Sequence, residues 1–140
     1  MRIRDFLIPA IAALLSSGCG LFYYTPYKVA HMTPEELRTI PDAHLCAGAG
    51  RATSKTIQAE IDRRALLSDE DREHIALERV AVGMSRCALE IVMPRRHYML
   101  VESTRDSTGL TRLTWQNEWG RVRKFYATID SQQRVTEWSE

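Results

Sequence analysis

The sequence lacks a hydrophobic run long enough to cross a bilayer as a helix. Its main apolar segment, Phe6 to Leu15, holds ten residues, whereas a helix that spans the hydrocarbon core needs about 20. The segment follows Arg2 and Arg4 and precedes small residues, which is typical of a secretory signal peptide. We therefore expect it to direct export and to be removed. The alternative is that it stays as an anchor helix.

The sequence also lacks an excess of charge of either sign. It holds 19 Lys and Arg against 18 Asp and Glu, a net charge of +1. Removal of residues 1–18 takes away Arg2, Arg4 and Asp5 and brings the balance to zero. A balanced domain has no general attraction for nucleic acid, so we expect no nucleic-acid partner. The basic clusters at 95–97 and 121–124 are better explained as charges that protect strand edges.

Motifs that carry chemistry are missing too. The glycine-rich stretch at 47–56 is not a phosphate-binding loop, because Ser54 and not glycine precedes Lys55. The chain has no Gly-x-Ser-x-Gly turn. His44 and Cys46 are two residues apart, and no second close pair completes a metal site. The sequence thus predicts no catalytic residue, no cofactor and no metal site, and hence no enzyme.

What the sequence does contain is a cysteine directly after the apolar segment. The stretch Leu15-Ser16-Ser17-Gly18-Cys19 resembles the lipobox of bacterial lipoproteins, with Leu15 one position earlier than that pattern prefers. The resemblance implies that residues 1–18 are a signal peptide, that the chain is cut before Cys19, and that Cys19 carries a lipid. The alternative is an ordinary signal peptide cut at another small residue.

The lipobox also gives an expected location. Gly20 follows Cys19, where an aspartate would favour retention in the inner membrane, so we expect anchorage in the outer membrane. The domain would then face the periplasm, attached by acyl chains on Cys19, with three chains exceeding what stable anchoring needs. In the oxidising periplasm the other two cysteines, Cys46 and Cys87, are expected to form a disulfide.

The mature chain divides into a tether, a helical part and a strand part. Residues 19–31 show no clear period and are predicted to be a tether, which either lies near the membrane interface or packs on the domain. Residues 32–140 are predicted to form a single domain, with helices over 33–93. Helices are expected to start at the caps Thr33, Ser68 and Ser85. An amphipathic helix is expected within 53–67, and a short helix from 42 is expected to end at the glycines of 47–50.

Beyond Pro94 the pattern of apolar residues changes from a period of 3.6 to a period of 2. Four segments rich in aromatic and β-branched residues are separated by turn residues and predict strands within 97–139. Strands joined by short turns pair antiparallel. The expected fold is therefore α+β, with N-terminal helices packed on one face of a three- to four-stranded antiparallel meander.

From Gly83 onward the chain has a Gly-Met-Ser start to a helix, a closing Pro94, and the strand sequences LTWQ at 113–116, KFYATID at 124–130 and RVTEW at 134–138. In these features it resembles the BamE (SmpA/OmlA) family of small outer-membrane lipoproteins. The resemblance implies an accessory role in outer-membrane protein assembly or envelope integrity.

Together these features predict a lipid-anchored envelope protein that acts as a non-catalytic binding or scaffold module with a protein partner. Trp119 and Trp138 are the candidate partner contacts, and the alternative for both is burial in the sheet. The second functional interpretation is an inhibitor or immunity-type lipoprotein that binds one specific periplasmic partner.

Overall fold

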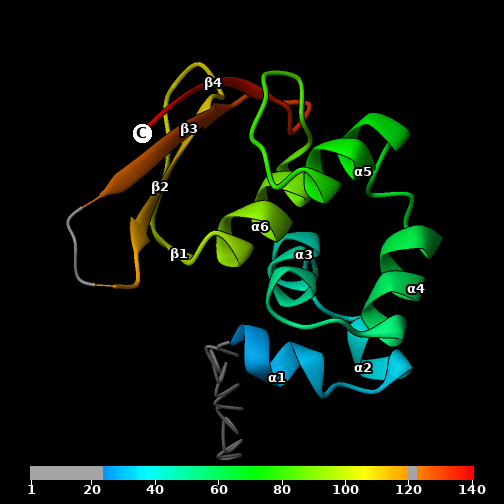
Figure 1. Cartoon of the computed structure of the whole chain (residues 1–140). Coiled ribbons are helices and arrows are strands. Elements are labelled where there is room, and N and C mark those ends of the chain that lie inside the picture. The colour runs from blue at the N-terminus through cyan, green and yellow to red at the C-terminus, as the bar shows by residue number, and fades with distance from the viewer. Residues whose placement is uncertain (1–23, 120–122) are drawn as a thin grey trace, which may run out of the picture.

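A computed structural model describes residues 24–119 and 123–140. In this part of the chain all helices precede all strands, which confirms the expected α+β fold. Figure 1 shows the helices on one side of the sheet, with α6 between the sheet and α3. The elements are α1 (Pro26–Ala30), α2 (Pro34–Leu37), α3 (Asp42–Arg51), α4 (Lys55–Arg63), α5 (Asp69–Ala76), α6 (Arg86–Arg95), β1 (Tyr98–Arg105), β2 (Thr111–Asn117), β3 (Lys124–Ile129) and β4 (Val135–Ser139).

The helix caps expected from the sequence are formed. Thr33 and Glu36 make a reciprocal capping box at α2, and Ser68 and Asp71 make another at α5. The hydroxyl of Ser85 accepts a hydrogen bond from the amide of Ala88 at the start of α6. These caps satisfy amides that have no partner within their own helix.

The folded domain begins before residue 32. The prediction that residues 19–31 form a tether is therefore wrong for the part of this segment that forms a helix. Residues 26–30 form α1, whose Thr25 cap accepts a hydrogen bond from the amide of Lys28. Val29 of this helix is fully buried in a cluster that includes Ile57 and Cys46. Tertiary burial stabilises a helix too short to form alone. Of the predicted tether, residues 19–23 lie outside the described residues.

Helix α3 does not end at its glycines, contrary to the expectation from the sequence. It continues to Arg51 because both glycines allow a close approach to another element. A Cβ atom on Gly48 would lie 2.5 Å from Cγ1 of Val29, and one on Gly50 would lie 2.6 Å from the carbonyl oxygen of Ile91. The glycines thus let α1 and α6 pack tightly against α3.

The last two helices of the chain end at Ala76 and Arg95. Helix α5 ends at Ala76, and Leu77 and Val82, which follow it, are exposed. Helix α6 continues one residue past Pro94 to Arg95. Proline is tolerated there because it removes only one hydrogen bond, in the last turn.

Helix α6 separates two apolar clusters and contributes to both. On one side, Leu89, Val92 and Met93 pack on the inner face of the sheet, where Trp115 and Phe125 are buried. On the other side, Cys87 and Ile91 join the helical cluster. The Cys46–Cys87 disulfide links α3 to α6, with Cα atoms 5.2 Å apart, which confirms the predicted pairing.

The sheet is an antiparallel meander in the order β1-β2-β3-β4. The register sets Trp115 opposite Phe125, and Ala127 opposite Trp138. A bulge interrupts the β1–β2 ladder between Leu100 and Glu102. The two edge strands of the sheet are therefore β1 and β4.

Candidate functional site

The edges of the sheet are not equally protected. The start of β4 is covered by the segment before α6: the amide of Gly83 donates to the carbonyl of Val135 (2.7 Å), and the amide of Val135 donates to Met84 (2.9 Å). In contrast, no other strand in the described part of the chain pairs with the outer edge of β1. Every residue of β1 after Tyr98 is exposed. β1 is thus the open edge.

This open edge carries three consecutive apolar side chains. Met99 is 51% exposed, Leu100 40% and Val101 50%. A strand edge with apolar side chains and unpaired main-chain groups can pair with another chain, and natural proteins usually protect such an edge with charge. None of these three residues is itself charged, and the nearest charged residue on the strand is Glu102.

Trp119, a predicted contact, lies at the same end of β1. Its side chain is 73% exposed and contacts only His97 among the described aromatic rings, edge to face at a centroid distance of 5.6 Å. The loop is held locally, because the amide of Trp119 donates to Oδ1 of Asn117 (2.8 Å) and the amide of Glu118 donates to the carbonyl of His97 (3.0 Å). An exposed tryptophan on a fixed turn is suited to contact a partner.

Trp138, the other predicted contact, is placed differently. It lies on β4, is 40% exposed, and stacks on Phe125 with ring centroids 5.7 Å apart. No ring contact among the described residues joins it to Trp119. One face of the Trp138 ring therefore covers the core. The two predicted contact residues, Trp119 and Trp138, do not lie together in the structure.

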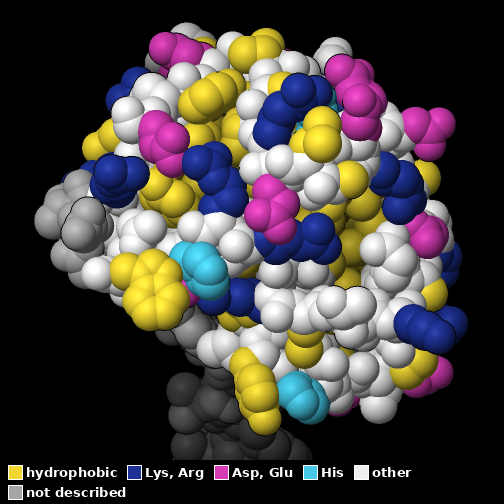
Figure 2. Space-filling view, viewed as in Figure 1, with side chains coloured by type: hydrophobic (Ala, Val, Ile, Leu, Met, Phe, Trp, Pro, Cys, Tyr) yellow, Lys and Arg dark blue, Asp and Glu magenta, His cyan; other side chains and the backbone are white. Residues whose placement is uncertain are grey.

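Basic side chains surround this end of the sheet. Arg96 is paired with Glu140 (2.7 Å), and Arg51 is paired with Glu118. Arg95, Arg123 and Lys124 are exposed and have no ion-pair partner among the described residues. Figure 2 shows basic and hydrophobic side chains side by side on this face. Arg95 lies at the end of α6, and Lys124 lies on β3, which β2 separates from the open edge.

Glu90 is a buried carboxyl that the sequence did not single out. Burial raises the pKa of Glu90 to about 7, although the guanidinium of Arg86 opposes the shift. Nε of Arg86 lies 3.7 Å from Oε1 of Glu90, and neither atom has a hydrogen-bond partner. Glu90 belongs to α6 and lies inside the protein, so it is a stability determinant and not part of the exposed surface.

Cys19 lies outside the described residues. Among residues 24–119 and 123–140, no group of His, Cys, Asp and Glu is arranged to hold a metal ion. Within the same residues, no helix has the length and apolar character needed to cross a membrane.

The sequence prediction missed the apolar triplet on β1, although a signal was present. Met-Leu-Val is a run of three apolar residues in a segment that otherwise alternates. Such a run on an edge strand places apolar side chains on both faces of the strand.

Comparison of the chain with family models, curated proteins and solved structures finds no match.

Proposed function

We propose that the protein is a lipid-anchored envelope protein that acts as a non-catalytic binding module. It is held in the outer membrane by acyl chains on Cys19 and faces the periplasm. The lipobox-like sequence before Cys19 supports the anchor. The Cys46–Cys87 disulfide supports an oxidising compartment.

The open edge of β1 is the observation that carries the binding function. An extended segment of a partner protein adds as a further strand, using the unpaired main-chain groups of β1 for affinity. Met99, Leu100 and Trp119 then supply apolar contacts.

An accessory role in outer-membrane protein assembly or envelope integrity is the more specific form of this proposal. It rests on the resemblance of the chain from Gly83 onward to the BamE family. A helix that packs on an antiparallel meander, as α6 does, is compatible with this resemblance. A shared fold does not by itself carry a shared function.

The anchor is tested by Cys19→Ala followed by cell fractionation. We expect the variant to leave the membrane fraction and to change its mobility on a gel, because it can no longer be lipidated. A variant that stays in the membrane with unchanged mobility would show that the lipobox interpretation is wrong.

The binding edge is tested by affinity capture from detergent-solubilised envelopes after mild crosslinking. Val101→Lys places a charge on the open edge, which is how natural edges resist pairing. We expect this variant and Trp119→Ala to lose a partner that the unchanged protein retains. Leu77→Lys is the matched control, because Leu77 is also an exposed apolar residue but lies after α5. Equal capture by all variants would contradict the proposal.

A further inference from the structure

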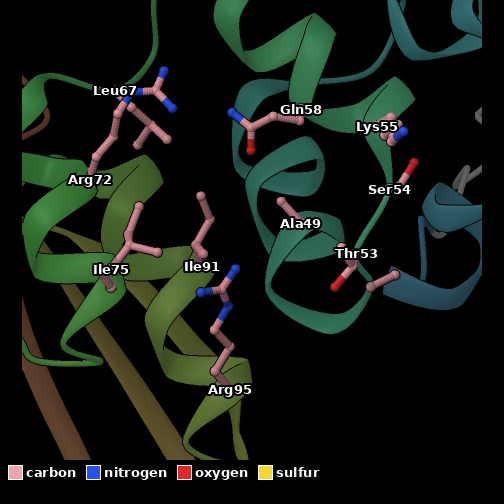
Figure 3. A pocket seen from close by; sticks show the side chains of 12 residues that line it. Ala49, Thr53, Ser54, Lys55, Gln58, Leu67, Arg72, Ile75, Ile91 and Arg95 are labelled. Atoms are coloured by element: carbon pink, nitrogen blue, oxygen red, sulfur yellow. The ribbon is translucent and has the colours of Figure 1, made fainter.

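A cleft of about 450 Å³ lies between two pairs of helices, away from β1. One side is formed by α5 and α6, and the other by α3, α4 and the segment that joins them. Figure 3 shows Ile75, Ile91 and Arg95 on one side and Ala49 and Thr53 on the other, with the guanidinium of Arg95 next to Ile91. Ligand sites in proteins commonly have volumes of this order.

The lining of this cleft is apolar along its floor and basic along its rim. Ile75, Ile91 and Leu67 give a continuous aliphatic surface, extended by alanines of α3 and α5. Among the described residues that line the cleft, three are basic and none is acidic. The chain as a whole is nearly neutral, so this is a local concentration of positive charge.

Two of the three cations are free to bind a ligand. Arg72 is engaged by Asp62 at 2.6 Å. Arg95 and Lys55 have no ion pair or side-chain hydrogen bond among the described residues. An unpaired guanidinium presents a fork of N–H groups that matches a planar carboxylate.

We propose that this cleft binds a single-chain carboxylate, such as a fatty acid. The apolar chain lies along Ile75 and Ile91, and the carboxylate pairs with Arg95, with Lys55 adding attraction at the rim. Burial of the ligand's hydrocarbon chain supplies affinity. The excess of basic side chains in the lining favours a ligand with a carboxylate head group over one with a neutral head group. This site is independent of the proposed strand-binding edge.

The test is a titration of the full chain carrying Cys19→Ala with decanoate, followed by amide NMR. The Cys19→Ala change removes the proposed lipid, which could otherwise compete. We expect saturable shifts at Ile75, Ile91 and Arg95, below the concentration at which decanoate self-associates. Decanol, the neutral analogue, should bind at least tenfold more weakly.

Matched variants separate the cleft from non-specific binding. Arg95→Gln removes the head contact, and Ala76→Phe fills the cleft from the exposed end of α5, so each should weaken decanoate binding at least tenfold. Arg38→Gln and Ala59→Phe change exposed residues outside the cleft and should leave binding unchanged. The proposal is overturned if decanoate does not saturate, if decanol binds equally well, or if the control variants weaken binding as much.

Discussion

The carboxylate of Asp71 accepts a hydrogen bond of 2.8 Å from the backbone amide of Ser85, a residue 14 positions further along the chain. The same side chain caps α5 by accepting from the amide of Ser68 (3.1 Å). Asp71 is almost fully buried, so it joins the start of α5 to the start of α6 within the protein. This contact orients α6 toward the sheet.

Removal of this carboxylate should destabilise the fold. Asp71→Ala loses a helix cap and leaves the buried amide of Ser85 without an acceptor, which together cost about 2–4 kcal/mol in the free energy of unfolding. Urea denaturation measures this loss. Asp69→Ala, an exposed change in the same helical turn, should cost less than about 0.5 kcal/mol. Equal stability of the two variants would contradict the role of Asp71.

The stability of the protein should fall as the pH rises from about 4.5 to about 7 because of Glu90. Burial raises the pKa of this carboxyl from 4.5 to about 7. Between these values the folded state holds a proton that the unfolded chain has lost, so the free energy of unfolding decreases with rising pH. The loss amounts to roughly 3 kcal/mol above pH 7.

Glu90→Gln gives the matched test of this pH dependence. Burial lowers the pKa of the nearby His44, with Arg86 adding to the shift, and this group acts in the opposite direction. The informative quantity is therefore the difference in unfolding free energy between Glu90→Gln and the unchanged protein. We expect this difference to grow in favour of Glu90→Gln from pH 5 to pH 8. A difference that does not change with pH would refute the assignment.

Alanine at Gly48 should be unfavourable, although alanine normally favours a helix. A Cβ atom there would lie 2.5 Å from Cγ1 of Val29, and such overpacking costs about 1–3 kcal/mol. Val29→Ala removes Cγ1 but keeps the Cβ of residue 29, which would lie 2.9 Å away, so it should relieve part of the cost of Gly48→Ala in a double-mutant cycle. Val29→Ala should not reduce the loss of stability caused by Gly50→Ala, because the added Cβ atom there conflicts with the backbone oxygen of Ile91. Purely additive effects of Gly48→Ala and Val29→Ala would show that the contact is absent.

The disulfide should make a large contribution to stability. It closes a loop between residues separated by 41 positions, which corresponds to about 4 kcal/mol in the chain-entropy model. The double variant Cys46→Ala, Cys87→Ala should lose stability of this order in urea denaturation. A thiol assay on the denatured, unreduced mature protein should find neither Cys46 nor Cys87 titratable, and two reactive groups would contradict the bond.

The sequence predicted those features that depend on neighbouring residues. The caps at Thr33 and Ser68 are local hydrogen bonds, and the four strands follow from alternation and turn residues. Helix α1 carries the same Thr-Pro start as α2, but only the burial of Val29 makes so short a segment helical. The helical state of Gly48 and Gly50 likewise depends on contacts with α1 and α6, which no local pattern contains.

The binding surface was predicted only in part for the same reason. Trp119 was singled out by residue type, and it is exposed. The exposure of Met99, Leu100 and Val101 depends on β1 being an unprotected edge, which is a property of strand order and not of the strand itself.

Site-specific photo-crosslinking in intact cells tests the central proposal most directly. A photoreactive residue is placed at Val101 on the open edge, and in a second variant at Leu77, which is exposed elsewhere. We predict that the probe at Val101 yields a discrete adduct with one envelope protein, that Trp119→Ala reduces this adduct, and that the probe at Leu77 does not yield it. Absence of an adduct at Val101, or the same adduct from both positions, would contradict binding at the edge of β1.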